Sequence, residues 1–303
     1  MAEWLYEAGV GEDRAALVEH DRIMEAYVER DDGAPRIGAV LAARLTEPTV
    51  ATFAGGEAML DRPPPGVTLG AALTIAIVRE AIPEADRPKR AKAVPTDDAP
   101  RPAPTLRQRL AGAPVRALRP HEPDALEGAG WSELMEEALT GEIAFAGGAL
   151  RMSPTSAMTL FDVDGSGDLA VLATRAATAV AQAILRHGIG GSIGIDFPTI
   201  AGKAPRQAVA AALDAALPPP FERTAVNGFG FLQIVRPRPR ASLPELLRAD
   251  PVLTAALAAL RQAERAGGHP VHVVPAVAAR IAATPAWTDA LSRRLGRVPI
   301  FTA

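Results

Sequence analysis

The chain has 303 residues, of which 48% are hydrophobic and 22% are charged, so its composition is that of a folded protein with a sizeable core. It contains no cysteine, which excludes disulfides and thiolate zinc sites. The formal net charge of −3 argues against a generally basic nucleic-acid coat, so any contact with RNA is expected in local basic patches.

The sequence also lacks the patterns of a secreted or membrane protein. We expect no apolar run to reach the length of a membrane span, and the start, MAEWLYEAGVGEDR, lacks the basic-then-apolar order of a signal sequence. A cytoplasmic location is therefore expected.

The first fifty residues have the pattern of β-hairpins. Apolar and polar positions alternate in short runs at residues 15–18, 22–28 and 37–45, and a polar break at 31–33 separates the second run from the third. Residues 51–78 continue with short runs around a Gly-Gly turn. These segments predict several short antiparallel strands.

A basic cluster and a linker follow. The cluster consists of Arg87, Lys89, Arg90 and Lys92. It is a candidate for RNA contact, although a charge run taken alone is more often a solvated turn. Residues 94–120 are rich in proline and charge, which predicts a linker with one short helix.

Two apolar runs, at residues 157–163 and 192–197, each carry one aspartate, Asp162 and Asp196, near the carboxyl end. The segment between them has helical periodicity, so the three elements predict a strand-helix-strand unit with parallel strands. Both carboxylates would then lie at one edge of a sheet, where a Mg²⁺ ion would relieve their repulsion. The alternative is that they are ordinary strand-end aspartates that cap turns.

Three arginines alternate in VRPRPR, at Arg236, Arg238 and Arg240. In an extended strand their side chains would share one face and could grip phosphates. The alternative is a proline-broken edge strand with solubilising arginines. Beyond them, residues 242–267 predict a helical run, and residues 269–303 predict the order strand, helix, helix, strand.

Three segments resemble, in the same order, motifs of the catalytic core of the ribonuclease E/G family. They are LFDVDGSGD, GIGGSIGIDFPTI and VNGFGFLQIVRPRPRASL. The resemblance implies that Asp162 and Asp196 bind a catalytic Mg²⁺, for which Mn²⁺ can substitute. Asp164 stands where the family usually has an asparagine, and it is a third candidate catalytic residue.

The resemblance extends to the rest of the chain and implies an RNA-binding OB-fold barrel near the N-terminus. Phe53 falls at an RNA-stacking position of the family and Lys89 at an RNA-contacting one, although Phe53 is equally well explained as a core residue. Two family features are missing. The segment at 94–120 leaves no room for the domain that senses a 5′ monophosphate, and without cysteine the zinc link between protomers cannot form, so no zinc is expected.

We therefore predict an OB-fold-like barrel followed by a mixed α/β catalytic domain with a small C-terminal α/β subdomain. The expected boundaries are 1–94, 95–120, 121–245 and 246–303. The predicted function is Mg²⁺-dependent cleavage of single-stranded RNA, independent of the 5′ phosphate; the alternative is an RNA-binding protein of the same fold that has lost cleavage. A homodimer without a zinc link stays open, and no membrane partner is expected.

Overall fold

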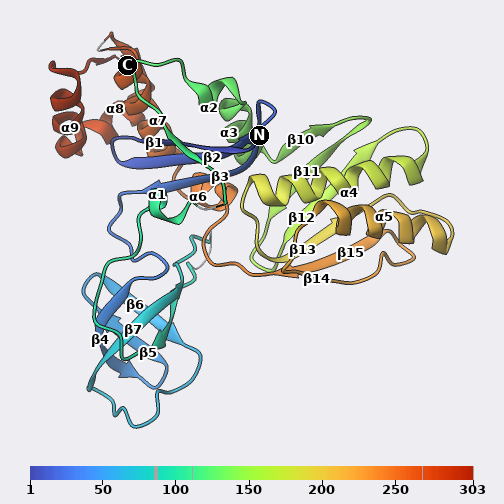
Figure 1. Cartoon of the computed structure of the whole chain (residues 1–303), viewed down its shortest axis with the longest axis horizontal. Helices are drawn as coiled ribbons and strands as arrows, with labels where there is room; N and C mark the ends of the chain where they lie inside the picture. The colour runs from blue at the N-terminus through green and yellow to red at the C-terminus, as the bar shows by residue number, and fades with distance from the viewer. Residues whose placement is uncertain (85–87, 111, 268, 303) are drawn as a thin grey trace. The chain divides into compact units, whose positions relative to one another are not determined.

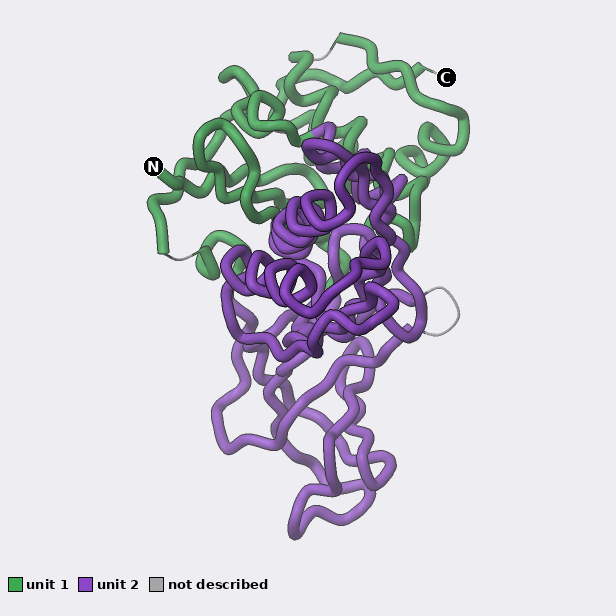
Figure 2. The backbone as a smooth tube through the Cα atoms, turned by 90° about the vertical axis from the view of Figure 1, so that its right-hand side faces the viewer, with its two compact units in different colours: residues 1–33, 105–131, 247–303 green, residues 34–104, 132–246 purple. Residues whose placement is uncertain are grey.

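The structure, a computed structural model, describes residues 1–84, 88–110, 112–267 and 269–302. Arg87 of the predicted basic cluster lies outside the described residues. The chain forms two compact units (Figure 2). Unit 1 combines residues 1–33, 105–131 and 247–303, and unit 2 combines residues 34–104 and 132–246.

Unit 1 contains a four-stranded sheet in the order β3-β2-β1-β9. Its strands are β1 (Glu3–Ala8), β2 (Glu12–Glu19), β3 (Arg22–Arg30) and β9 (Val115–Ala117). The predicted hairpin of β2 and β3 is confirmed: His20 and Asp21 both have positive φ in its turn, as a two-residue type I′ hairpin requires. β9 pairs parallel to β1, so a segment far along the chain completes the sheet.

The rest of unit 1 is mainly helical. Its further elements are α1 (Leu106–Arg109), α2 (Ala125–Gly128), α7 (Pro251–Arg265), β16 (Val271–His272), α8 (Pro275–Ala282), α9 (Pro285–Leu295) and β17 (Phe301–Thr302). The predicted strand-helix-helix-strand order at the end of the chain is confirmed, with β16 and β17 paired in parallel. The run expected at residues 242–267 is two helices, α6 (Leu243–Ala249) and α7, because Asp250 caps α7 and Pro251 begins it.

A buried ion cluster connects the sheet of unit 1 to α2 and α7. Arg14, 2% exposed, donates from Nε to Glu7 Oε2 over 2.5 Å and from a terminal nitrogen to Asp124 Oδ2 over 2.6 Å. Its guanidinium also lies 5.0 Å from the centre of the Trp131 ring. The cluster comprises Glu7, Glu12, Arg14, Asp124, Arg261 and Arg265. Charges this deeply buried stabilise the fold only while all partners are present.

The Asp124 carboxylate makes part of this stability pH-dependent. Burial alone would raise the pKa of Asp124, but Arg14 and the α2 backbone outweigh that effect and lower it. A lowered folded-state pKa gives stability that is present above the unfolded value of about 3.9 and is lost as pH falls through the folded value. Asp124→Asn keeps an N-cap side chain for α2 but removes the charge. We expect the free energy of unfolding of this variant at pH 7 to be about 1.5–3 kcal/mol lower than that of the natural chain.

Urea unfolding of both proteins at pH 7 and at pH 3 checks this expectation. The free-energy gap between them should narrow at pH 3, where the natural carboxylate is itself becoming protonated. A gap of the same size at both pH values would contradict the assignment of the effect to charge.

Unit 2 begins with a closed five-stranded barrel in the order β4-β5-β6-β8-β7 (Figure 1). Its strands are β4 (Val40–Glu47), β5 (Val50–Phe53), β6 (Gly56–Leu60), β7 (Ala72–Arg79) and β8 (Ala91–Pro95). Small buried side chains, such as Ala51, Ala58 and Ala93, alternate with Leu and Ile around the interior. This composition suits a barrel too narrow to hold many large side chains.

A six-stranded mixed sheet forms the rest of unit 2, in the order β10-β11-β12-β13-β15-β14. Its strands are β10 (Glu142–Phe145), β11 (Gly148–Pro154), β12 (Thr159–Gly165), β13 (Gly191–Asp196), β14 (Glu222–Arg223) and β15 (Phe231–Arg236). The helices α4 (Leu169–Arg186) and α5 (Lys203–Ala216) lie side by side on one face, as Figure 1 shows. Helix α3 (Trp131–Thr140) precedes the sheet.

The broad prediction of a barrel plus a mixed α/β part is confirmed, and so is the strand-helix-strand unit, because β12 and β13 are parallel neighbours joined through α4. The buried stripe of α4 includes Ala173, Ala177 and Val180, whereas Val171 is 47% exposed. Among the described residues, α4 is also the one helix long and apolar enough to cross a membrane by length and composition, so the expectation that no run reaches that length is wrong. Here its apolar stripe packs on the sheet.

The predicted domain boundaries differ from the units. Residues 1–33 group with 105–131 and 247–303 and not with the barrel that follows them. The predicted linker is also more than a linker, because it contributes α1 and β9. The reason is the parallel pairing of β9 with β1, a contact across more than a hundred residues that no local pattern reveals.

Candidate functional site

One row of side chains crosses the sheet of unit 2 on the face opposite α4 and α5. Pairing places Arg151 of β11 beside Asp162 of β12, and Asp162 directly beside Asp196 of β13. Glu142 of β10 and Phe231 of β15 extend the row at its two ends. We call these five residues the charged row.

Alternation along the strands puts the row on the exposed face. Phe161 and Val163 flank Asp162 and are buried in the core, and Ile195 before Asp196 is buried too, whereas both aspartates are exposed. Successive side chains of a strand point to opposite faces, so the two carboxylates share one surface. Contrary to the expectation, Asp162 lies in the middle of β12 and not near its end, because β12 runs on beside β11 after its pairing with β13 ends.

The two aspartates suit a single hard cation. Neighbouring strands are about 4.8 Å apart, so these side chains leave the sheet close together and repel each other. Mg²⁺ is typically held by one or two carboxylates, with water and phosphate oxygens at its other positions. Among the described residues no group of three or more His, Cys, Asp or Glu side chains could hold a metal. The two carboxylates would supply only part of the coordination shell of such an ion, and oxygens of water or a ligand would have to supply the rest.

Asp164 and Arg151 border this pair. Asp164 lies two positions after Asp162 on the same face and is exposed. Arg151 donates from Nε to Glu142 over 3.0 Å, and this bond, together with the nearby charges of Asp164 and Asp162, raises the pKa of the guanidinium. A fixed positive charge thus sits beside the aspartates, where it can also face a phosphate.

Gly194 opens the surface next to Asp196. A Cβ atom at this position would lie only 2.7 Å from Phe231 Cζ, 2.8 Å from Leu160 Cδ2 and 3.0 Å from Met158 Sδ. Those three side chains therefore close over the glycine and form a small apolar floor beside the carboxylates. At Gly190 and Gly191, Pro237 and Arg238 of the chain itself occupy the space that Cβ atoms would need.

Phe53 packs against the core of the barrel and is partly buried. It lies at the end of β5, on the same side of the strand as Ala51. In the β5–β6 hairpin it faces Gly56, where a Cβ atom would touch its ring. This placement favours the core alternative over the stacking position.

Lys89 and Arg238 share one carboxylate. Lys89 Nζ lies 2.5 Å from Glu84 Oε1, and the Arg238 guanidinium lies 3.3 Å from the same oxygen. Arg238 also pairs with Glu245, which accepts from the backbone and hydroxyl of Ser242 over 2.8 Å. Two predicted RNA contacts are therefore neutralised within unit 2.

The three alternating arginines do not line the charged row. β15 ends at Arg236, so the strand expected to hold Arg238 and Arg240 stops short of them. Arg236 is five positions from Phe231, about 17 Å along the strand, and it shares the helix-covered side with Ile234. All three side chains are half-buried.

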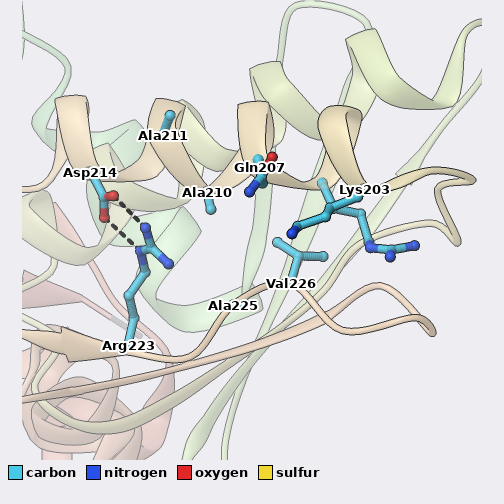
Figure 3. Close-up of a pocket in the computed structure, with 9 residues that line it drawn as sticks. Lys203, Gln207, Ala210, Ala211, Asp214, Arg223, Ala225 and Val226 are labelled. Carbon is cyan, nitrogen blue, oxygen red and sulfur yellow. Dashed lines mark hydrogen bonds and ion pairs between the residues drawn. The ribbon is translucent and has the colours of Figure 1, made fainter.

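Sequence reasoning missed two further features of unit 2. Phe229, in the loop before β15, is 84% exposed. A groove of about 510 Å³ lies along α5, with Lys203, Arg206 and Arg223 among its lining residues (Figure 3). The sequence signal for Phe229 was a large aromatic residue between two glycines. The signal for the groove was a pair of cations in the first turn of a helix that begins soon after Asp196.

Comparison of the chain with models of known protein families gave no match, and comparison with curated proteins gave none either.

Proposed function

We propose that the protein is a Mg²⁺-dependent endoribonuclease that cleaves single-stranded RNA without regard to the 5′ phosphate. The observation that carries this proposal is the in-register pair of Asp162 and Asp196 on the exposed face of parallel strands. Such a pair holds a divalent cation that, when bound, activates water and offsets charge on a phosphate. The motif resemblance to the ribonuclease E/G family supports the same reaction.

The chain's own residues have separate tasks in this proposal. Asp162 and Asp196 hold the cation, and Asp164 offers a further acceptor for an attacking water. Arg151 stabilises negative charge on the scissile phosphate from the other side of Asp162. The five-stranded barrel, read as an OB-fold, supplies a surface for the single strand, since barrels of this class bind oligonucleotides.

A labelled A/U-rich oligomer tests the proposal directly. It is incubated with the protein and Mg²⁺, Mn²⁺ or EDTA, beside its deoxyribo counterpart and versions with a 5′ mono- or triphosphate. We expect internal cleavage of the RNA with either metal, none in EDTA, and equal rates for the two 5′ ends. Cleavage of the DNA at the same rate would redirect the proposal to a general phosphodiesterase.

The competing proposal is an RNA-binding protein that has lost cleavage. Asp164 favours it, because it adds a negative charge to a face that already carries two aspartates, and that charge opposes the approach of a phosphate. Binding of the oligomer with no cleavage under any divalent ion would select this alternative.

The ion pairs of Glu84 lead to a prediction for either function. Glu84→Gln would release Lys89 and Arg238 from their shared carboxylate. We expect tighter RNA binding, and a dependence of the logarithm of the binding constant on the logarithm of salt concentration that is steeper by up to about 0.7 for each cation that gains a phosphate. Fluorescence anisotropy over a salt series measures this slope. An unchanged slope would show that neither cation reaches RNA. Glu3→Gln, which breaks the exposed pair with Arg116 in unit 1, is the matched control.

A further inference from the structure

The loop that carries Phe229 is held in one shape. Asn227 Oδ1 accepts from the backbone N–H of Phe229 over 2.9 Å and from that of Phe231 over 3.0 Å. Gly230 has φ of +96°, and a Cβ atom there would collide with the carbonyl of Phe197. The loop therefore presents its aromatic ring to solvent from a fixed backbone, although burying that ring would be favourable.

This loop is bonded to the segment that directly follows Asp196. Phe197 N–H donates to Gly230 O over 3.2 Å, and Thr199 Oγ1 donates to Phe229 O over 3.4 Å. Two residues further on, Phe231 pairs with Asp196 in the charged row. The exposed ring therefore lies near the end of β13 that carries Asp196.

Cations line the groove at the start of α5, seven positions after Asp196. Arg223, at the other end of the groove from Lys203, is held by two bonds to Asp214, as Figure 3 shows. Lys203, by contrast, has no ion pair within the part of the chain that the structure describes, and it is exposed. Arg206 donates to the carbonyl of Ile200 over 3.2 Å. The groove thus keeps two positive charges for a ligand.

We propose that Phe229 stacks on a base of the single strand next to the scissile phosphate, and that Lys203 and Arg206 hold the adjoining backbone phosphates. This assignment rests on the proposed RNA-directed function. It gives the RNA a second contact region, separate from the surface of the barrel. An aromatic platform beside cations is the general arrangement for single strands, and every base has a face that can stack. A carboxylate-bearing peptide would use the cations but would leave the ring without a partner.

Binding in EDTA tests the platform separately from cleavage. An RNA oligomer containing 2-aminopurine is titrated with the natural chain and with Phe229→Ala, Phe229→Trp and Val235→Ala. Val235 is 51% exposed on the face of β15 that carries Phe231. It is the matched control because it lies four positions beyond Phe231, further along the strand from Phe229. We expect quenching by the natural chain, a rise in Kd of about 5- to 150-fold with alanine, recovery with tryptophan, and no change for the control.

The double variant Lys203→Ala/Arg206→Ala tests the cations. The slope of the logarithm of the binding constant against the logarithm of salt concentration should become shallower by about 0.7 for each lost phosphate contact. Equal affinity and quenching for Phe229→Ala and the natural chain would overturn the platform, as would a natural chain that does not bind the oligomer. If cleavage fails but Phe229→Ala still weakens binding, the platform stands and the nuclease proposal falls. If cleavage occurs but Phe229→Ala does not weaken binding, the nuclease proposal stands and the platform falls.

Discussion

Replacing Asp196 by asparagine is expected to lower Mg²⁺-dependent RNA cleavage by at least about 10²-fold. Changes in the residues that merely support metal ligands typically cost 10- to 100-fold, so loss of a ligand charge should cost at least as much. Asparagine keeps the size of the side chain and its place on the exposed face, next to Asp162. The rate of appearance of cleaved oligomer, measured against Mg²⁺ concentration, is the readout.

The change should act through the metal and not through the fold or through total charge. Asp289→Asn makes the same change in net charge on an exposed position of α9, and its rate should stay at the natural level. Asp162→Asn should reproduce the loss, and the double variant should lose little more, since both side chains serve one ion. Undiminished cleavage by Asp196→Asn would end the assignment of the aspartate pair as the metal site.

Replacing Glu7 by glutamine is expected to destabilise the protein by about 3–5 kcal/mol, because it removes one partner from a buried group of charges. Glu7 is 4% exposed and contacts the guanidinium groups of Arg14, Arg261 and Arg265. Burial already lowers the pKa of Arg261, even though Glu12 and Glu7 stabilise its charge. Without the carboxylate of Glu7, three cations would face an amide inside the protein.

Urea denaturation followed by circular dichroism measures the change as a shift in midpoint. Asp98→Asn is the matched control, because its pair with Arg101 has both side chains more than half exposed and should change stability by no more than about 1 kcal/mol. A Glu7→Gln variant no less stable than this control would mean that the cluster is not a support of unit 1.

The charged row shows what local patterning can establish. Phe161, Asp162 and Val163 alternate between buried and exposed positions in the way that the sequence predicts for a strand. The helical period of the segment before Asp196 similarly indicates a crossover, and a crossover makes parallel pairing the expected outcome. These signals are local, so they survive without knowledge of the rest of the chain.

The register between β12 and β13, and the neutralisation of two basic side chains, depended on the tertiary structure. Nothing in the two strands by themselves aligns Asp162 with Asp196, since a slip of two residues would keep both side chains on the same face and still separate them along the strands. The sequence shows that Lys89 and Arg238 are basic, but only the folded structure shows that both pair with Glu84. Partners so far apart along the chain leave no periodic signal.

The aromatic residues divide in the same way. Both Phe53 and Phe229 lie beside turn glycines, yet the first packs against the barrel core and the second is 84% exposed. The sequence by itself determined the strand-helix-strand unit and which of its strands carry Asp162 and Asp196, because these follow from the short-range spacing of polar and apolar residues. Only the tertiary structure decided the strand register, which charges are neutralised and which ring meets solvent, because each depends on contacts between distant segments.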